Sequence, residues 1–342
     1  MRTDLAIFTS DRFADHLNPP GHPERLERAE VMQVVAAEFR RRGADVREPR
    51  PATEAELARV HDPEYISLIS ETAGRATALD SDTFTSPDSY EVALLAAGAA
   101  IGCVDHVLGG RGRRGLAMVR PPGHHAERNR AMGFCLFNNI AVAAAHARAL
   151  GLGRVAIVDF DVHHGNGTQW SFYDDPSVLF ISSHQYPYYP GTGAATETGT
   201  GRGAGFTVNL PMDAGGTDAD YELAYATVGF PVLRQFRPEL ILISAGFDAL
   251  DDDPLGGMRL STDEFVRLTA AICAIADQCC DGRVVAVTEG GYDLAGLAGC
   301  LRAVTAVLAG DHFEGVAPTG DARRGRTAIA AALPGLRQYW QL

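Results

Sequence analysis

Residues 154–167 read RVAIVDFDVHHGNG, and this stretch decides the fold class. Its first part, RVAIVDF (154–160), is apolar and lacks the alternation of a half-buried strand, so it predicts a strand buried on both faces. Such strands belong to parallel sheets that helices cover on both sides. The polar residues that follow mark the carboxyl end of the strand, which is where open parallel sheets bind their ligands.

The same pattern of apolar runs, turns and helical segments recurs along the chain. Further strands are predicted at 5–8, 178–183, 206–211, 240–246 and 284–291. Helices are predicted at 86–110, 138–151, 218–236, 261–278 and 293–309. The helix at 261–278 begins with a Ser-x-x-Glu pattern, which predicts a capping box. The alternation predicts an α/β fold with a central, mostly parallel sheet flanked by helices.

Composition bounds the class of protein. The chain has 342 residues, 46% of them hydrophobic, which permits one large α/β domain or two smaller ones. Its formal net charge is −13, and an acidic surface repels phosphate, so we expect no nucleic-acid binding. The six cysteines form no CxxC pair, which indicates reduced thiols and a cytoplasmic location. We expect neither a signal peptide nor a membrane span.

Predicted strand ends carry residues that suit a metal site. Asp161 and His163 are two residues apart in extended chain, so their side chains point to the same side. Asp248 follows the strand at 240–246 and can supply a third ligand. Two carboxylates and one imidazole leave an open position on zinc, as a catalytic site requires. An isolated Asp-x-His would simply cap a strand, but that interpretation does not account for the other strand ends.

Two more motifs carry groups that hydrolysis needs. His124 and His125 stand in a Pro-Gly turn, and imidazoles there can move protons beside a metal near neutral pH. Asp159 and Asn166, from the loop of the proposed ligands, can orient the second nitrogens of these rings. Tyr292 follows two glycines and is a candidate hydrogen-bond donor to an oxyanion. Taken singly, each of these is equally an ordinary loop residue without a role.

Seven blocks of sequence, in order along the chain, resemble the histone deacetylase family. They are RPPGHHA (120–126), GFCLFNN (133–139), DFDVHHGNG (159–167), YPGTG (189–193), SAGFDA (244–249), DPLGG (253–257) and EGGY (289–292). Their spelling is similar to the class II branch and its bacterial relatives. The resemblance implies a three-layer arginase/deacetylase-like fold and a single domain over 1–342, with a motif-bearing core at about 15–310 and a helical tail at 311–342.

The resemblance also implies a role for each matched position. One catalytic zinc would be held by Asp161, His163 and Asp248. The catalytic groups would be His124, His125, Asp159, Asn166 and Tyr292. The acyl-lysine tunnel would be lined by Gly133, Phe134, Tyr189, Leu255 and Gly291, with Asp82 at its rim. One or two structural potassium ions would be bound, at one site by Asp159, Asp161, His163, Ser182 and Ser183, and at the other by Phe172, Asp175 and Val178.

Within this set, His125 would be the main general base, and His124 would act mainly by electrostatics. Asn166 supports that division, because a neutral amide raises the pKa of His125 less than a carboxylate would. The metal would activate a water molecule and polarise the acyl carbonyl, and Tyr292 would stabilise the oxyanion.

We therefore expect a zinc-dependent deacylase that removes an acyl group, with acetyl the first choice, from an acylated lysine or a related alkylamine. An acetylpolyamine or small-metabolite amidohydrolase is the main alternative. Leu255 makes the polyamine reaction less favoured, because polyamine-selective relatives carry Glu at that position. Preference for longer or hydroxylated acyl groups is another. A dinuclear manganese ureohydrolase would need more carboxylates, and a non-catalytic acyl-lysine binding module would not need both histidines and Tyr292. The tail segment 326–340 is a candidate docking helix or a contact in a homo-oligomer.

Overall fold

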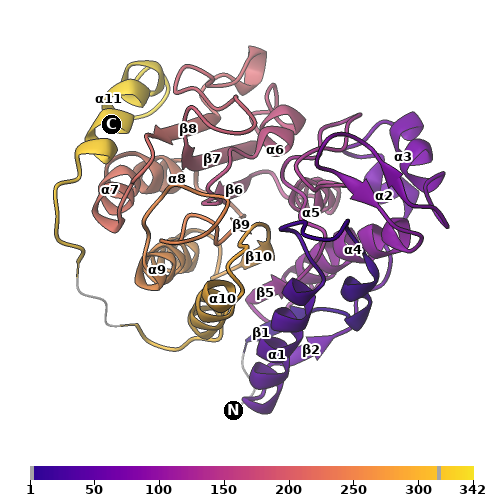
Figure 1. The fold of residues 1–342 in the computed structure, drawn as a ribbon. Helices are drawn as coiled ribbons and strands as arrows, with labels where there is room; N and C mark the ends of the chain where they lie inside the picture. The colour runs from indigo at the N-terminus through magenta and orange to yellow at the C-terminus, as the bar shows by residue number, and fades with distance from the viewer. Residues whose placement is uncertain (1–3, 314–316) are drawn as a thin grey trace.

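A parallel sheet forms the middle of this computed structural model, which describes residues 4–313 and 317–342 (Figure 1). Its strands are β1 (Leu5–Phe8), β2 (Asp45–Arg47), β5 (Arg114–Ala117), β6 (Val155–Asp159), β7 (Val178–Gln185), β8 (Thr207–Met212), β9 (Leu240–Ala245) and β10 (Val284–Thr288). They lie in the order β2-β1-β5-β10-β9-β6-β7-β8, and each pair of neighbours is parallel. A small antiparallel pair is formed by β3 (Thr77–Ala78) and β4 (Phe84–Thr85).

Helices cover both faces of this sheet (Figure 1). They are α1 (Glu27–Arg41), α2 (Glu54–Leu57), α3 (Pro63–Ser70), α4 (Ser89–Leu108), α5 (Asn139–Ala149), α6 (Asn166–Ser171), α7 (Asp218–Ala224), α8 (Phe230–Phe236), α9 (Thr262–Cys279), α10 (Leu294–Leu308) and α11 (Arg323–Leu336). In β6, Ala156 and Val158 pack in the core with α9 and α10, whereas Val155 and Ile157 pack in the core with α4 and α5. The strand is therefore apolar on both faces up to its last residue, Asp159, and the predicted fold class is confirmed.

The order of the strands brings the motif-bearing ends together. Four neighbours in the middle of the sheet, β5, β10, β9 and β6, run in the same direction, so their carboxyl ends share one edge. Asp159, the last residue of β6, is in register with Ser244 of β9, and Ala245 of β9 is in register with Thr288 of β10. Each of these strands is followed within a few residues by one of the polar motifs.

The helix predicted at 218–236 is interrupted. The π-helical turn Tyr225–Gly229 separates α7 from α8, and the amide of Phe230 donates to the carbonyl of Tyr225, five residues earlier. Pro231 explains the change, because it has no amide hydrogen to continue the α-helical bonding pattern. The wider turn leaves the Tyr225 hydroxyl next to the sheet, 2.9 Å from the Ser183 hydroxyl.

The capping box predicted at the start of α9 is wrong. Ser261 precedes the helix without a side-chain cap bond, because its amide and hydroxyl both donate to the carboxylate of Asp218. The Glu264 carboxylate pairs with Arg267 at 2.8 Å instead of reaching back. The Ser261 hydroxyl thus donates to Asp218 of α7, although the local pattern had assigned it to the first turn of its own helix. Several elements, among them the strand β5 and the 15-residue helix α1, were not singled out in the sequence.

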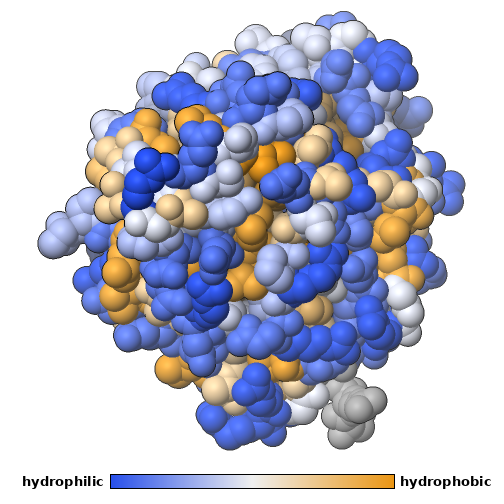
Figure 2. Space-filling view, turned by 90° about the vertical axis from the view of Figure 1, so that its right-hand side faces the viewer, coloured by the Kyte–Doolittle hydropathy of each residue, from blue (hydrophilic) through white to orange (hydrophobic). Residues whose placement is uncertain are grey.

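Apolar composition at two places reflects burial inside this fold. Among the described residues, α4 is long and apolar enough to cross a membrane by length and composition, but 72% of its most apolar window is buried in the core. In the tail, the predicted 326–340 segment contains most of α11, which packs against α7 and β8 of the same chain. The surface shown in Figure 2 is mostly hydrophilic, with hydrophobic groups scattered in small clusters.

Candidate active site

Three buried side chains converge at the carboxyl ends of β6 and β9. The possible ligand atoms of Asp161, His163 and Asp248 all lie within 4.8 Å of one another. His163 Nδ1 is 3.1 Å from Asp161 Oδ1 and 3.1 Å from Asp248 Oδ2. The structure therefore brings together the three residues that the sequence put forward as metal ligands.

The spacing of these atoms fits one tetrahedral cation. Ligand atoms about 2.0–2.1 Å from zinc are separated by roughly 3.3 Å in a tetrahedron, close to the observed 3.1 Å. Burial and the two carboxylates act in opposite directions on His163, and the carboxylates prevail, raising its pKa to about 10. A divalent cation would take the place of that proton. Within residues 4–313 and 317–342 this is the one cluster of three such side chains.

The glycine after Glu289 lets β10 approach this cluster. A Cβ atom added at Gly290 would lie 2.1 Å from Asp248 Oδ2 and 2.7 Å from Asp161 Oδ2. The Gly290 amide donates to Asp161 Oδ2 at 2.9 Å. Any side chain at this position would therefore displace the proposed ligands.

The two histidines after β5 lie beside the cluster with different partners. His124 Nδ1 is 3.0 Å from Asp159 Oδ2, and His125 Nδ1 donates to Asn166 Oδ1 at 2.8 Å. The Asn166 amide group is oriented by its own donation to Glu127 Oε1 at 2.7 Å. This arrangement leaves the Nε2 atom of His125 free of a proton and able to accept one.

Electrostatics gives these adjacent rings different charge states, with His124 cationic and His125 neutral. Burial lowers the pKa of His124, but Asp161 and Asp159 outweigh it and raise that pKa to about 10. Burial, with the neighbouring His124 and His163, lowers the pKa of His125 well below its usual range. The ring centroids are 4.0 Å apart, so a cationic His124 holds His125 neutral.

A cavity of about 180 Å³ leads from the surface to this cluster. Its lining residues are Asp82, His125, Gly133, Phe134, His163, Tyr188, Tyr189, Leu255 and Tyr292. Gly133 has φ of +56°, and a Cβ atom there would lie 2.4 Å from His125 Cδ2, so the wall tolerates no side chain at this position. The predicted tunnel residues and the rim residue Asp82 thus lie around one cavity, with Gly291 as the exception.

Gly291 lies behind the cavity and not in its wall. A Cβ atom at this residue would meet Phe247 and Leu297, and its carbonyl accepts from Arg28 Nε at 2.8 Å. The assignment of Gly291 to the tunnel is therefore corrected. The backbone there turns with φ of +119°, which places the next side chain, Tyr292, toward the cavity.

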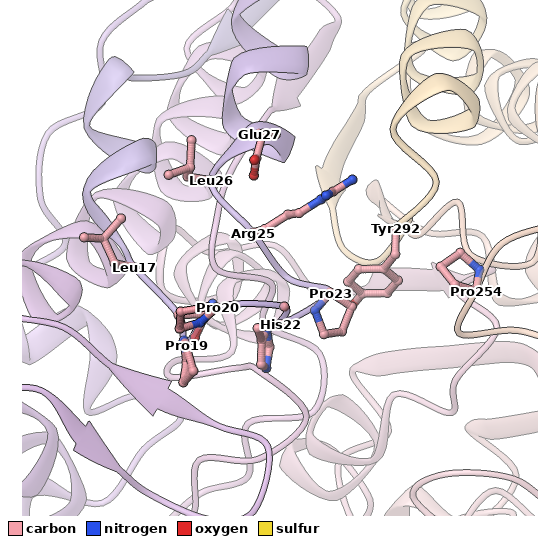
Figure 3. Close-up of a pocket in the computed structure, with 12 residues that line it drawn as sticks. Leu17, Pro19, Pro20, His22, Pro23, Arg25, Leu26, Glu27, Pro254 and Tyr292 are labelled. Atoms are coloured by element: carbon pink, nitrogen blue, oxygen red, sulfur yellow. The ribbon is translucent and has the colours of Figure 1, made fainter.

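Tyr292 lies between two cavities. Its ring is 5.8 Å from that of Phe134 across the first cavity, and the Arg28 guanidinium lies 5.0 Å from the ring centroid. The second cavity, of about 380 Å³, is bounded by residues of the segment 17–27 together with Pro254 and Tyr292 (Figure 3). In Figure 3 the Tyr292 ring lies beside Pro23 of that segment.

A buried ion-pair network supports this tyrosine, and sequence reasoning missed it. Arg28 donates to the carbonyls of Glu289 at 2.5 Å and Gly291 at 2.8 Å. The Glu24 carboxylate accepts from Arg28 at 2.9 Å and from Arg120 at 2.5 and 2.7 Å. Burial raises the pKa of Glu24, but the two arginines outweigh it and lower that pKa to about 2. Arg120, at the start of the RPPGHHA block, was the available signal.

Two further supporting residues were also missed. The Glu289 carboxylate accepts from the amides of Gly123 at 2.7 Å and His124 at 3.1 Å, so it fixes the histidine turn. Tyr188 stacks on the His163 ring with an interplanar angle of 17° and a centroid separation of 5.5 Å. The sequence held a signal for each residue. Glu289 is the first residue of the EGGY block, and Tyr188 directly precedes the YPGTG block.

The residues suggested for potassium fall in two places. Asp159, Asp161, His163, Ser182 and Ser183 lie at the carboxyl ends of β6 and in β7, next to the cluster, whereas Val178 begins β7 in register with Val155 at the start of β6, so the second set lies toward the opposite edge of the sheet. Ser182 is in register with Asp159, and its hydroxyl is 2.9 Å from His184 Nδ1. The carbonyl of Phe172 accepts from the Asp175 amide at 3.0 Å. The Asp175 carbonyl accepts from the Val178 amide at 3.3 Å. These carbonyl oxygens keep a second lone pair for a ligand.

The parallel sheet, with acidic and histidine side chains converging at its edge, is an α/β fold of the arginase/deacetylase type. Comparison with known proteins agrees. The sequence model of the histone deacetylase domain matches residues 22–308. A crystal structure described as the HDA15 HD domain superposes with a TM-score of 0.92 and 36% identity, covering 99% of this chain and 95% of that one.

Two curated relatives are similar over most of the chain. Human polyamine deacetylase HDAC10 is 40% identical over 339 residues, covering 92% of this chain and 50% of the relative. The histone deacetylase-like amidohydrolase of Pseudomonas aeruginosa is 40% identical over 302 residues, covering 87% of this chain and 78% of the relative. The chain belongs to the histone deacetylase family. It spans about half the length of the human relative.

Proposed function

We propose that this protein is a zinc-dependent deacylase that removes an acyl group, with acetyl the preferred one, from an acylated lysine or a related alkylamine. The observation that carries the proposal is the position of Asp161, His163 and Asp248 at the inner end of a narrow cavity that also contains His125 and Tyr292. When bound, zinc supplies a Lewis acid that polarises the acyl carbonyl and makes water acidic enough to react at neutral pH.

The protein's own groups then have distinct tasks. His125 accepts the proton of the attacking water at Nε2, because Asn166 holds the other ring nitrogen as a donor. Tyr292 donates its hydroxyl hydrogen to the oxyanion that develops on the acyl oxygen. His124, held cationic by Asp159 and Asp161, stabilises negative charge nearby. The proton taken up by His125 is returned to the leaving amine.

The walls of the cavity suit an unbranched stem. Phe134 and Tyr189 present aromatic surface on the two sides, and the Tyr189 ring is 5.2 Å from that of His125. A lysine side chain carries four methylenes, which such walls exclude from water. Asp82 lines the same cavity and offers a carboxylate to donors on the substrate outside the tunnel.

The test is turnover of an acyl-lysine panel by the purified protein, before and after removal of metal with a chelator. We expect acetyl-lysine peptide to be hydrolysed, activity to vanish on chelation, and one equivalent of zinc to restore it. No turnover of any acylated amine after reconstitution with zinc would contradict the proposal. Metal analysis that finds two manganese ions per chain in place of one zinc would favour a ureohydrolase.

An acetylpolyamine is the second candidate substrate, because one relative of 40% identity is named a polyamine deacetylase. Leu255 disfavours it, since an apolar side chain at the cavity gives no counter-charge to a second ammonium group. Competition between acetyl-lysine peptide and acetylspermidine, compared by kcat/KM, decides between them.

We also propose structural potassium next to the cluster and a cytoplasmic location. Buried oxygen-rich groups around Ser182 and Asp159 support the first. Free thiols support the second, because the six cysteines form no disulfide and five of them are buried. The melting temperature, measured in potassium chloride and in choline chloride at equal ionic strength, tests for the ion. We expect it to be higher in potassium chloride.

A further inference from the structure

The loop between β9 and α9 contains a buried carboxylate that the proposed chemistry does not use. Asp253 is 5% exposed, and its two oxygens accept three backbone hydrogen bonds. Oδ2 accepts from the amides of Tyr292 at 2.7 Å and Asp293 at 3.1 Å. Oδ1 accepts from the amide of Leu255 at 3.0 Å. One side chain therefore holds two segments that are far apart in the sequence.

The Tyr292 segment needs such a hold. Gly290 and Gly291 precede the tyrosine, and two glycines restrict its backbone very little. Arg28 binds carbonyls before Tyr292, but Asp253 is the group that binds the tyrosine's own amide. The next residue, Asp293, caps α10, so Asp253 also fixes the tyrosine against the start of that helix.

Leu255, on the other side of Asp253, belongs to the cavity wall. Its amide is held by Asp253, and its carbonyl accepts from the Tyr188 hydroxyl at 3.3 Å. Tyr188 in turn stacks on His163. A continuous set of contacts thus runs around the cavity. It begins at the proposed metal ligand His163 and passes through Tyr188, Leu255 and Asp253 to Tyr292.

We propose that Asp253 is a positioning residue that fixes the oxyanion donor Tyr292 and the cavity-wall residue Leu255 in one arrangement. The inference rests on the proposed function. Its chemical basis is that an ionised carboxylate accepts hydrogen bonds at both oxygens, and the three bonds here require both. An amide in its place offers one acceptor and one donor, so it must lose either the Tyr292 side or the Leu255 side.

The experiment is a double-mutant cycle between Asp253→Asn and Tyr292→Phe, with kcat and KM measured on an acetyl-lysine reporter. With the tyrosine hydroxyl present, Asp253→Asn should lower kcat by about tenfold or more, as loss of an orienting hydrogen bond typically does. In the Tyr292→Phe background it should change kcat by less than about twofold, because the group it positions is gone. Bound zinc per chain should be equal in all four proteins.

The matched control is Asp252→Asn, one residue earlier. Asp252 is exposed and has φ of +72°, a conformation that asparagine adopts readily, so this substitution removes the same charge without touching the cavity. We expect wild-type kcat and KM. If Asp253→Asn does not fold, Asp253→Glu, which retains both oxygens but moves them by one methylene, should show the same dependence on Tyr292.

A second measurement is independent of turnover. Amide hydrogen exchange in the resting protein should be faster in Asp253→Asn than in the wild type and in Asp252→Asn, at Tyr292 and Asp293 where the asparagine loses that side, or at Leu255 where it loses the other. Equal loss of kcat with and without the Tyr292 hydroxyl, or unchanged kcat, or unchanged exchange at all three amides, would overturn the inference. Failure of the wild type to hydrolyse any acylated amine would instead count against the proposed function, and the exchange measurement would still report on Asp253.

Discussion

The end of β6 and the end of β10 lie on the same edge of the sheet but are held in different ways. After β6, the chain holds itself: Asp159 Oδ1 accepts from the Asp161 amide at 3.1 Å, and Asp161 Oδ1 accepts from the His163 amide at 2.9 Å. After β10, the holding groups come from elsewhere in the sequence, from Arg28 and Asp253. The β6 end combines these local bonds with two from distant residues, Gly290 and Asp248, whereas the side-chain supports of the β10 end all come from distant residues.

The largest expected effect comes from the β6 end. Asp161→Asn should abolish zinc binding and lower turnover about a thousandfold or more, because the cation supplies several kcal/mol of transition-state stabilisation. Metal analysis and reporter turnover measure both outcomes. Asp251→Asn, an exposed carboxylate, is the control. Stoichiometric zinc in Asp161→Asn would show that this residue is not a ligand.

The next largest effect comes from the reactive group at the β10 end. Tyr292→Phe should lower kcat by about a hundredfold to a thousandfold, as the loss of one oxyanion donor does. Zinc content and KM should stay near those of the wild type, since the phenyl ring keeps its contact with Phe134. Near-normal kcat in this variant would remove Tyr292 from the chemistry.

The distant support of the β10 end should matter less to catalysis and more to stability. Arg28→Met leaves the carbonyls of Glu289 and Gly291 without their donor, which costs about 1–3 kcal/mol per buried group in the free energy of unfolding. We expect a lower melting temperature and a smaller loss of kcat than in Tyr292→Phe. Arg25→Met, three residues earlier and exposed, should change neither quantity.

The smallest expected change is a shift along the pH axis. Burial, His124 and His163 keep the pKa of His125 low, and the neutral Asn166 opposes this only weakly. In Asn166→Asp, a carboxylate stabilises the imidazolium, so the pKa of His125 rises and the base becomes protonated at a higher pH. The acidic limb of the kcat/KM profile should therefore move to higher pH. An unchanged limb would mean that His125 is not the titrating base.

The same contrast explains how far the sequence could be read. The strand β6 and the Asp-x-His that follows it lie within ten residues, so apolar patterning and extended geometry were sufficient to place them. The supports of Tyr292 could not be read in this way, because Arg28 is more than 250 residues away from the carbonyls it binds. Helical and strand periodicity relate only residues that are close in the sequence, so they cannot link Arg28 to Glu289 or Gly291.

Two errors in the helices have different origins. The Ser261 hydroxyl was assigned to its own helix by a short-range pattern, but Asp218 from another helix binds it. The π-helical turn at Tyr225–Gly229 arises from Pro231, whose effect on the preceding turn was visible in the sequence and was not used. Local patterns thus predict an element well and predict its ends poorly when a distant group competes.

The helix α11 sets a practical boundary for anyone who dissects this enzyme. It lies beyond the stretch 22–308 that the domain model matches, yet Ala328, Ala332 and Leu336 are buried in the core beside β8. A fragment trimmed at the last motif would leave that apolar wall open to water and would invite aggregation. We therefore expect a fragment that folds and works to extend at least to Trp340, whose indole N–H donates to the Gly205 carbonyl at 2.7 Å.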